Sequence, residues 1–597
     1  MNTINAKIEA VRKKMLENNI SIYIVPTNDY HSSEYIGDYF KTREYITGFT
    51  GSAGTAVITK DKAILWTDGR YYIQAEKELY GSEVLLYKAG MEGVPSVAEF
   101  ISGEVSVGDI VGIDGKCTND GYISTLGKKL EEKKASVKLD IDIVGSIWND
   151  RPKLASNEIY ELDVQYTGEK RYSKLMRVGE YMHEKGCEYF VLTSLDDIAW
   201  LLNLRGDDIQ CNPVFFSYFI KTRSEGFLYV LEGAVSDEIK QKLEKDNIRI
   251  KKYEDFYNAL SAIDRNESVL LDRNLVNALV TEKLKGCNIV DDINPTLIMK
   301  ATKNSTEVDN VRKAHIKDGV AVTKFIYWLK NTMKDMEVTE YEAATYLENL
   351  RKQNENYIGA SFEPIVAYGE NAAMCHYSPK ITSSAIIKRD SYLLIDTGGH
   401  YLEGTTDITR TVMLGKASDE EKLHYTLVLK GNLRLGAAKF TYGCKGQNLD
   451  YLARESLWER GLDYNHGTGH GVGYLLNVHE GPNSIRSRIS NVKNPDAEIL
   501  REGMITSNEP GIYLEGKYGI RLENLIVCKK LEKTEYGQFM GFETLTLVPF
   551  DMDAIDLNLL TDREISILRD YHKRVYETLE IYLSDEEKNW LYTLCNF

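Results

Sequence analysis

The chain has 597 residues, of which 43% are hydrophobic and 27% are charged, and its formal net charge at pH 7 is −17. Because a single hydrophobic core stops growing near ~250–300 residues, this length predicts about three domains with sizeable cores. The acidic balance argues against a general nucleic-acid-binding protein, which needs a basic face, and against a polybasic membrane anchor.

The cysteines and the apolar segments of the sequence indicate the cellular compartment of the protein. The eight cysteines are scattered and form no C-x-x-C pair, which disfavours a disulfide framework or a structural zinc site. The first 20 residues form an amphipathic pattern without the apolar stretch of a secretory signal. No run of ~18 apolar residues occurs, so no membrane span is predicted. We therefore expect a cytoplasmic protein with no membrane or nucleic-acid partner.

The first 150 residues alternate between helix and strand patterns. Residues 5–18 have helical periodicity, and 21–26 form a short apolar run typical of a strand. Residues 55–69 predict two strands around a turn, and 71–79 return to a helix. This alternation is typical of an α/β domain.

A similar order of elements follows. A helix is predicted over 171–186 and a strand over 189–194, and two further strands are predicted over 214–222 and 225–231. Residues 160–300 are therefore interpreted as a second α/β domain of the same kind as the first.

The third region begins near Ala301 and combines helices with glycine-rich strands. A long helix is predicted over 305–333, with Ser305 in its N-terminal cap region, and a second helix over 338–353. Residues 360–415 and 500–548 are rich in strand patterns and glycine turns. A helical region, 418–460, lies between them, and residues 551–597 form a helical tail.

Two predicted hairpins each carry two acidic residues. In 391–414, Asp396 and Asp407 are symmetric about a turn centred between Tyr401 and Leu402, so we expect them to face each other across the ladder. Carboxylates placed opposite each other repel unless a cation lies between them.

The second hairpin repeats the arrangement. In 504–528, Glu509 and Glu523 are symmetric about Gly516. Asp396 and Glu523 adjoin apolar runs and are expected to be partly buried, and a buried carboxylate needs a partner. Within these strands only Arg410 and Arg521 offer a positive charge.

A histidine-rich and glycine-rich segment, residues 466–482, lies between the hairpins. It contains His466, His470 and His479, and its glycines allow close approach to a ligand. Four carboxylates and one imidazole suit two divalent cations, because the formal charges cancel. Oxygen-rich ligation favours manganese, with cobalt or zinc as alternatives. Two such cations would support hydrolysis of a carbonyl bond, with the other histidines moving protons.

A structural interpretation competes with each of these motifs. A buried aspartate in a strand is most often a satisfied structural acid, and a glycine-rich loop can contain histidines that have no function. His315 and His572 are interpreted as structural, and His400 as a solvated turn residue. The combination of two acidic hairpins with an intervening histidine segment favours the hydrolytic site.

These residues resemble the pita-bread metallopeptidases, a family that includes methionine aminopeptidase, prolidase and aminopeptidase P. The family has five metal ligands, Asp, Asp, His, Glu and Glu, in chain order. The resemblance is strongest to the long, three-domain cytosolic Xaa-Pro aminopeptidases and covers nearly the whole chain. The segments that carry it are GFTGSAGTAVIT (48–59), WTDGRYYIQA (66–75), EGTTDITRT (403–411), HGTGHGVG with NVHEGP (within 466–482), GIRLEN (519–524) and the tail from Pro549 to Leu591.

The resemblance implies a mixed α/β and α+β fold. Two creatinase-like α/β domains, 1–155 and 156–302, would precede a pita-bread catalytic domain, 303–550, and a helical extension, 551–597. It also implies a homodimer that releases the N-terminal residue from peptides with proline at the second position.

Residue roles follow from the same resemblance. Asp396 would bind one metal, Asp407 and Glu523 would bridge both, and His470 and Glu509 would bind the other. The residues that would act on the substrate or its protons are catalytic His376, His466 and His479, and substrate-binding Arg70, Tyr513 and Arg521. Cys375, beside His376, is interpreted as a small apolar filler, and it departs from the family pattern.

Alternative functions share the fold. Prolidase has the same five ligands and cuts only Xaa-Pro dipeptides, but the long N-terminal half and the C-terminal tail favour the aminopeptidase. Methionine aminopeptidases lack two such N-terminal domains. A non-catalytic peptide-binding module and a creatinase-type amidinohydrolase are both disfavoured by the intact ligand set.

Overall fold

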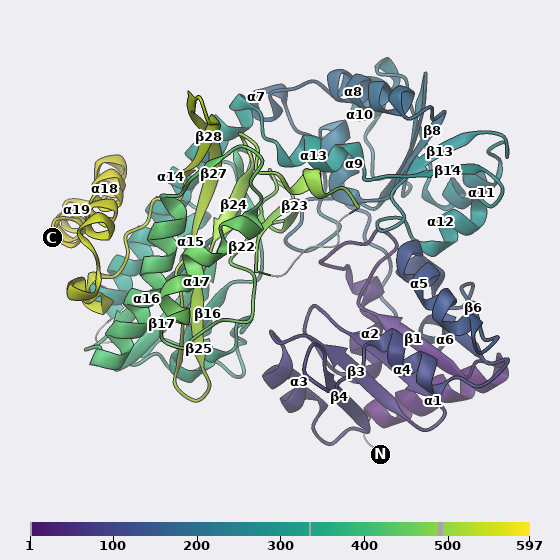
Figure 1. The fold of residues 1–597 in the computed structure, drawn as a ribbon, viewed down its shortest axis with the longest axis horizontal. Helices are drawn as coiled ribbons and strands as arrows, with labels where there is room; N and C mark the ends of the chain where they lie inside the picture. The colour runs from purple at the N-terminus through teal and green to yellow at the C-terminus, as the bar shows by residue number, and fades with distance from the viewer. Residues whose placement is uncertain (1–2, 334–335, 488–492) are drawn as a thin grey trace. The chain divides into compact units, whose positions relative to one another are not determined.

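The computed structural model describes residues 3–333, 336–487 and 493–597. They divide into two compact units (Figure 1). The N-terminal unit comprises Met1–Leu162 and Glu169–Thr296, and the C-terminal unit comprises Asp163–Gly168 and Leu297–Phe597.

The first α/β domain is built on a six-stranded sheet with the order β4-β3-β2-β1-β5-β6. The predicted helices and strands up to residue 79 are confirmed. One face packs against α1 and α3, and the other against α4 and α5. The bounds are α1 Thr3–Glu17, β1 Ile22–Pro26, β2 Thr55–Thr59, β3 Ala63–Thr67, α3 Tyr72–Leu79, β4 Val84–Lys88, α4 Val97–Glu104, β5 Ile110–Ile113, α5 Asp120–Glu131 and β6 Ser136–Lys138.

A second six-stranded sheet has the order β12-β11-β10-β8-β13-β14. In both six-stranded sheets the strand that comes first in the chain lies centrally, antiparallel to one neighbour and parallel to the other. This match confirms that two similar α/β domains follow each other in the chain. The bounds are α8 Arg171–Glu184, β8 Tyr189–Leu192, α9 Leu195–Leu202, β10 Ser217–Thr222, β11 Gly226–Val230, β12 Ile248–Lys252, β13 Ser268–Leu271 and β14 Asn288–Asp291.

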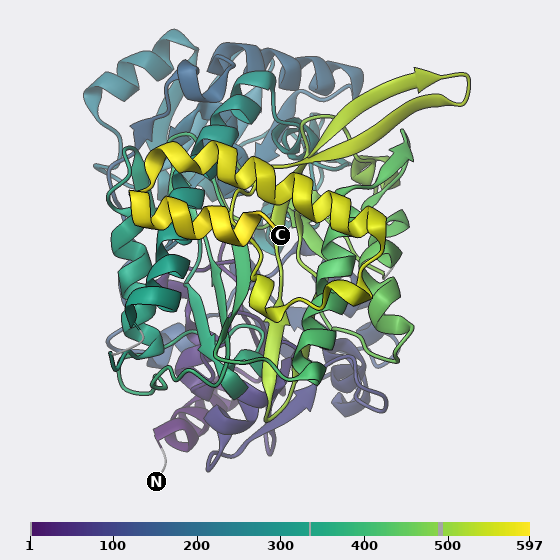
Figure 2. The ribbon, with the colours of Figure 1, turned by 90° about the vertical axis from the view of Figure 1, so that its left-hand side faces the viewer.

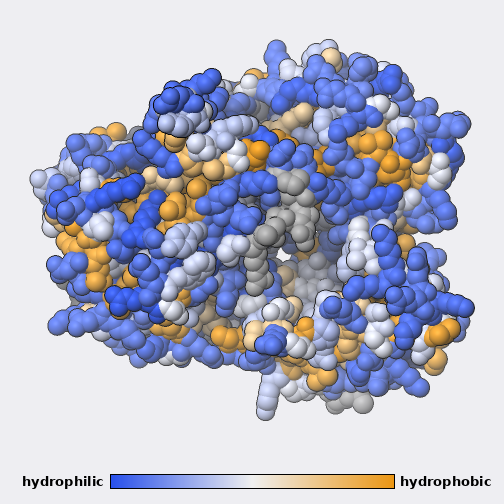
Figure 3. All heavy atoms as spheres, in the orientation of Figure 1, coloured by the Kyte–Doolittle hydropathy of each residue, from blue (hydrophilic) through white to orange (hydrophobic). Residues whose placement is uncertain are grey.

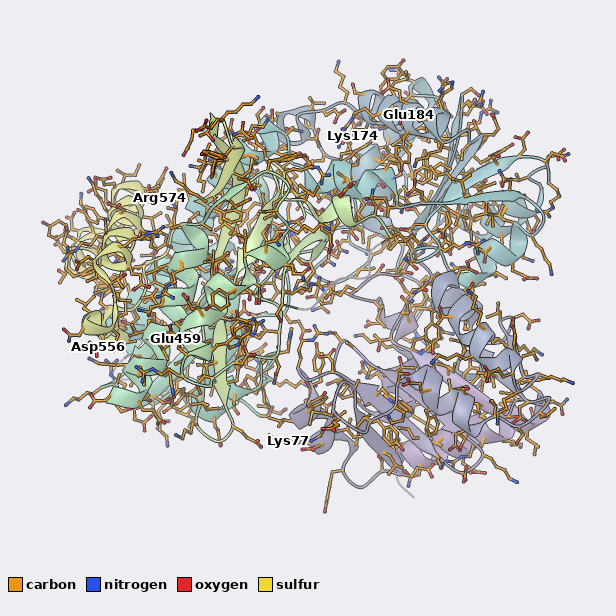
Figure 4. The ribbon with its side chains drawn as sticks, viewed as in Figure 1. Lys77, Lys174, Glu184, Glu459, Asp556 and Arg574 are labelled. Atoms are coloured by element: carbon orange, nitrogen blue, oxygen red, sulfur yellow. The ribbon has the colours of Figure 1, made fainter. Side chains whose placement is uncertain are left out.

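A buried lysine joins two helices of the second domain. Lys174, labelled on α8 in Figure 4, donates from Nζ to the Trp200 carbonyl at 2.9 Å and to Asn203 Oδ1 at 2.7 Å. These bonds satisfy the charged group inside the protein, as a buried cation requires.

The C-terminal unit begins with long helices. α14 (Ser305–Tyr327) is followed by a π-helical turn, Trp328–Thr332, and then by α15 (Glu340–Arg351). The predicted cap at Ser305 is off by one residue, because Asn304 accepts from the Glu307 N–H and Glu307 completes the capping box. The helical middle comprises α16 (Asp419–Gly436) and α17 (Asp450–Trp458), with the short strand β21 (Lys439–Thr441) between them.

Two sheets of this unit contain or adjoin the acidic residues. A three-stranded sheet has the order β16-β17-β20 and packs against α14 and α15. A six-stranded sheet has the order β21-β28-β27-β24-β22-β23, with the two-stranded β25-β26 continuing from it. The bounds are β16 Ile365–Tyr368, β17 Ser391–Thr397, β20 Ile408–Leu414, β22 Gly469–Gly471, β23 Glu480–Ile485, β24 Ile505–Asn508, β25 Gly511–Leu514, β26 Tyr518–Arg521, β27 Asn524–Thr534 and β28 Gly537–Thr544.

The predicted helical tail is confirmed. α18 (Asp562–Leu579) and α19 (Asp585–Cys595) lie side by side, and the β27–β28 hairpin extends beyond the neighbouring elements (Figure 2). Both helices contribute to a core shared with α16. Arg574, labelled on α18 in Figure 4, donates to the Thr544 carbonyl at the end of β28.

All eight cysteines are free thiols, as their scattered positions predict. The face drawn in Figure 3 is largely hydrophilic, with hydrophobic residues scattered over it. Among the described residues, no helix combines the length and the apolar character needed to span a bilayer.

Candidate metal centre

The first acidic hairpin forms with a register that differs from the prediction. Asp396 lies on β17 opposite Thr409, and Asp407 immediately precedes β20. The expectation that Asp396 and Asp407 face each other is therefore wrong by two residues. The turn is centred between Leu402 and Glu403, one residue later than predicted, because Tyr401 pairs with Gly404.

The second hairpin has the predicted register. Asn508 pairs with Asn524 on one side of the acids, and Gly511 pairs with Arg521 on the other. Both pairings belong to one register, in which Glu509 and Glu523 stand opposite each other. The symmetric turn at Gly516, where φ is +70°, allows this register to continue.

Four of the five predicted ligands meet directly. One ligand atom from each of Asp407, His470 and Glu523 lies within 4.8 Å of the others. Nε2 of His470 is 3.5 Å from Asp407 Oδ2 and 3.4 Å from Glu509 Oε1. The sheet register and the histidine segment therefore converge on one acidic cluster.

The fifth predicted ligand, Asp396, belongs to the same electrostatic cluster. Burial, followed by repulsion from Asp407 and Glu509, raises its pKa to about 6 even though Arg521 pairs with it. Burial also raises the pKa of Glu523 well above its usual value, and repulsion from Asp407, Glu509 and Asp396 adds to this. The negative charges of these carboxylates therefore repel one another when no cation lies between them.

His470 responds in the opposite direction. Burial alone would lower its pKa, but the hydrogen bond to Asp407 and the charges of Glu509 and Asp407 raise the pKa to about 9. Its Nδ1 lies 2.9 Å from the Gly471 carbonyl oxygen. The Nδ1–H therefore donates to this carbonyl, which orients Nε2 toward the carboxylates, as the hydrogen bond from the other ring nitrogen does for metal-ligating histidines.

Two carboxylate oxygens without hydrogen-bond partners indicate that the cluster can accept cations. Asp396 Oδ1 and Glu523 Oε1 are buried and accept no hydrogen bond from the described residues. Buried carboxylate oxygens normally have partners, and here the missing partners lie where several acids converge. Four carboxylates and one imidazole match the donor set of hard or borderline divalent cations, so the residues fit two such ions.

A hydrogen-bonded chain leads away from the acids. Arg521 pairs with Asp396 through Nη2 and donates from Nη1 to the Tyr513 hydroxyl at 2.6 Å. That hydroxyl lies 2.8 Å from His466 Nε2, and His466 Nδ1 lies 2.7 Å from the Gly467 carbonyl oxygen. Because the carbonyl can only accept, Nδ1 carries the proton and Nε2 accepts from Tyr513. Burial lowers the pKa of His466 to about 4, so the ring is neutral at pH 7.

The other predicted histidines lie in this unit. The ring of His479 is 4.3 Å from that of His470, with an interplanar angle of 81°. His376 is half-buried in the turn after the 3₁₀ helix Gly369–Ala373. Arg521 Nη2 donates to the carbonyl of the preceding residue, Cys375, at 3.4 Å.

Two further expectations concern Arg70 and His400. Arg70 lies in the N-terminal unit, where its Nη2 pairs with Asp68 Oδ2 at 2.8 Å. The expectation that His400 is a solvated turn residue is wrong. It lies on β18 (Gly399–Tyr401), is 2% exposed, and its Nδ1 is 3.0 Å from Thr405 Oγ1, because the strand continues to Tyr401 and the turn is at Leu402–Glu403.

Two residues of the site were missed from the sequence. Thr409 Oγ1 donates to Glu523 Oε2 at 2.9 Å, and Ser507 Oγ donates to Glu509 Oε1 at 2.9 Å. Each hydroxyl residue lies two positions from a predicted ligand, Asp407 or Glu509, where strand alternation returns a side chain to the same face. This two-residue spacing from a predicted ligand could have identified both hydroxyl residues from the sequence.

The chain matches family models along nearly its whole length. Residues 309–530 match metallopeptidase family M24, and residues 538–596 match the C-terminal region of peptidase M24. Residues 7–142 and 150–307 each match a creatinase/prolidase N-terminal domain.

Full-length relatives carry consistent names. A protein of Pyricularia oryzae named "Probable Xaa-Pro aminopeptidase P" is 40% identical, with 97% of this chain and 96% of the relative covered. "Xaa-Pro aminopeptidase 1" of Dictyostelium discoideum is 39% identical, with 98% and 96% covered. The crystal structure of the X-prolyl aminopeptidase of Caenorhabditis elegans, described as a cytosolic enzyme with a di-nuclear active site, superposes with a TM-score of 0.95 at 33% identity and covers 100% of both chains.

Proposed function

The chain belongs to metallopeptidase family M24, and from this premise we propose that it is an Xaa-Pro aminopeptidase. It releases the N-terminal residue from peptides with proline at the second position. The end-to-end match to proteins with this name, across the N-terminal domains and the C-terminal extension, carries the proposal. A match confined to residues 309–530 would fit any activity of the family.

The acidic cluster is the proposed binding site for two divalent cations. Asp396, Asp407, His470, Glu509 and Glu523 would hold the two ions. Manganese is the proposed ion, with cobalt and zinc as alternatives. When bound, the pair supplies Lewis acidity that polarises the scissile carbonyl and makes water nucleophilic near neutral pH.

The surrounding residues orient the site and move protons. Arg521 offsets the charge of Asp396 and holds the Tyr513 hydroxyl, which in turn bonds to neutral His466. His376 and His479 are the proposed groups beside the scissile bond that supply a proton to the departing nitrogen. Arg70 is a proposed substrate contact from the N-terminal unit.

Proline makes this proton supply necessary. The Xaa-Pro bond is a tertiary amide, so its nitrogen has no N–H with which an ordinary exopeptidase could form a hydrogen bond. After cleavage that nitrogen leaves as a secondary amine and must gain a proton. A site with several histidines around two cations meets this need.

Further features of the molecule are also proposals. The domains are proposed as residues 1–155, 156–302 and 303–550 with the extension 551–597. We propose a homodimer, and we propose the cytosolic location that is stated for the C. elegans protein.

A three-substrate assay tests the function. Metal-stripped protein is incubated with Arg-Pro-Pro, Arg-Ala-Ala or Arg-Pro, with and without Mn²⁺, and free arginine is measured. We expect release only from Arg-Pro-Pro and only with metal. Cleavage confined to Arg-Pro would indicate a prolidase. Bound metal without any cleavage would indicate a non-catalytic binding module.

A further inference from the structure

A buried glutamate outside the acidic cluster gathers four hydrogen bonds. Glu340 is the first residue of α15 and is 0% exposed. Its Oε1 accepts from the Tyr368 N–H at 2.7 Å and from Asn371 Nδ2 at 3.0 Å. Its Oε2 accepts from the Tyr377 hydroxyl at 2.6 Å and from the Ala385 N–H at 2.9 Å. Both oxygens are thus fully used.

All four donors belong to one stretch of chain, residues 368–385. This loop connects the end of β16 to the segment before β17 and contains the turn with His376. Glu340 therefore holds the start, the middle and the end of the loop at a single carboxylate. The end is also fixed by the backbone, because the Ile387 N–H donates to the Val338 carbonyl at 2.8 Å.

The charge of the carboxylate strengthens this arrangement. The four donors are neutral groups, and hydrogen bonds to an ionised acceptor are stronger than those between neutral groups. Glu340 also lies in the first turn of α15, where the helix dipole favours a negative charge. A neutral side chain of the same shape would keep the packing but offer only one acceptor oxygen.

His376 stands between two anchored neighbours. On one side the Cys375 carbonyl accepts from Arg521, the residue that pairs with Asp396. On the other side the Tyr377 hydroxyl donates to Glu340. The backbone at His376 is therefore fixed relative to the acidic cluster through Arg521 and relative to α15 through Glu340.

We propose that Glu340 is a positioning residue for catalysis, which holds the 368–385 loop so that His376 points into the reacting centre. The inference rests on the proposed function, in which His376 acts beside the scissile bond. Glu340 touches neither substrate nor metal ligand in this role. It acts through Tyr377 and the loop backbone.

The test compares two glutamates on the same helix. Glu340→Gln is the test variant. Glu348→Gln is the matched control, because Glu348 Oε2 also accepts a tyrosine hydroxyl, that of Tyr357 at 2.7 Å, and the partners of Glu348 are Tyr357 and Lys352, which lie outside the loop. We expect Glu340→Gln to increase hydrogen exchange in residues 374–384 and to lower kcat/KM on Arg-Pro-Pro by about tenfold to a hundredfold, as loss of supporting partners does elsewhere. Bound Mn²⁺ should stay unchanged, and Glu348→Gln should match the wild type in all three measurements.

A double-mutant cycle with His376→Ala separates positioning from general stability. If Glu340 acts through His376, Glu340→Gln should cause little further loss of kcat/KM when His376 is already alanine. An equal loss in both backgrounds would overturn the proposal. So would unchanged exchange in 374–384.

A milder variant covers the case in which Glu340→Gln fails to fold. Tyr377→Phe removes one of the four donors and should show a smaller loss with the same dependence on His376. An effect independent of His376 would overturn the proposal. If the wild type cleaves no Xaa-Pro peptide, the proposed function fails on that result alone, while the exchange measurement still decides whether Glu340 orders the loop.

Discussion

Two buried glutamates of the C-terminal unit differ in what surrounds them. Glu340 is 0% exposed, and both of its oxygens accept hydrogen bonds from the 368–385 loop. Glu523 is 1% exposed, but one of its oxygens has no partner among the described residues, and its other neighbours include Asp396, Asp407 and Glu509. Burial alone does not separate the two residues.

The difference lies in the sign and number of the partners. Donors around Glu340 stabilise its charge, so that residue contributes to folding without any ligand. Acids around Glu523 oppose its charge, so the protein without metal carries an unfavourable interaction that a cation would relieve. A buried acid surrounded by other acids therefore indicates a cation site, whereas one surrounded by donors indicates an anchor.

The largest expected effect is at Glu523. Glu523→Gln should lower Mn²⁺ affinity by more than ~10²-fold, because it removes the charge of a proposed metal ligand, whereas loss of a residue that only supports a ligand typically costs about 10–100-fold. The same change should raise the free energy of unfolding of the metal-free protein, because glutamine avoids the repulsion from Asp407, Glu509 and Asp396 that disfavours the ionised form of Glu523. Calorimetric titration and chelator-treated unfolding measure the two effects.

The control variant for this prediction should change the free energy of unfolding in the opposite direction. Glu340→Gln should leave Mn²⁺ affinity unchanged and lower the free energy of unfolding. If both variants destabilise the metal-free protein equally, the contrast between the two glutamates is wrong.

A third buried glutamate extends the comparison to charged partners. Glu480 adjoins His479 and pairs with Lys300 at 3.0 Å and with Lys303, all three being buried. Glu480→Gln should destabilise the protein by about 3–5 kcal/mol, because it leaves buried lysines without a counter-charge. Denaturant unfolding measures this loss.

An exposed pair supplies the control for Glu480. Glu502 pairs with Lys530 at 3.0 Å, and both side chains are more than half exposed. Glu502→Gln should change the free energy of unfolding by less than about 1 kcal/mol, as surface pairs do. Equal losses at the two positions would show that burial does not set the strength of these pairs.

A smaller, pH-dependent effect is expected at Asp396. Burial and acidic neighbours raise the pKa of Asp396 from 3.8 to about 6 in the folded protein. Folding therefore favours its protonated form, and this contribution to stability is lost as the pH rises from 3.8 through about 6. Each unit of such a shift corresponds to about 1.4 kcal/mol.

Asp396→Asn isolates this titration, because asparagine does not ionise. In metal-free protein, the stability of the variant relative to the wild type should increase between pH 4 and pH 6.5. The attraction to Arg521 exists only when Asp396 is ionised, so it titrates together with Asp396 and is already contained in the pKa of about 6. A constant difference across this range would contradict the raised pKa, and bound Mn²⁺ should abolish the trend.

The two acidic hairpins show how far sequence reasoning reaches. Symmetry about Gly516 placed Glu509 opposite Glu523 correctly, because glycine at that position marks the turn. The same reasoning failed for Asp396 and Asp407. The first hairpin offers several glycines, and the actual turn at Leu402–Glu403 contains none of them.

Local patterns of the sequence by themselves determined the elements, the two similar α/β domains and the identity of the acidic and histidine residues, because periodicity and residue chemistry are local properties. Only the tertiary structure decided which side chains meet. The register of β17–β20, the burial of His400 and the four bonds of Glu340 all depend on contacts between segments far apart in the chain. Hydrogen-bond partners and the shifts in pKa arise from those contacts, so no local pattern contains them.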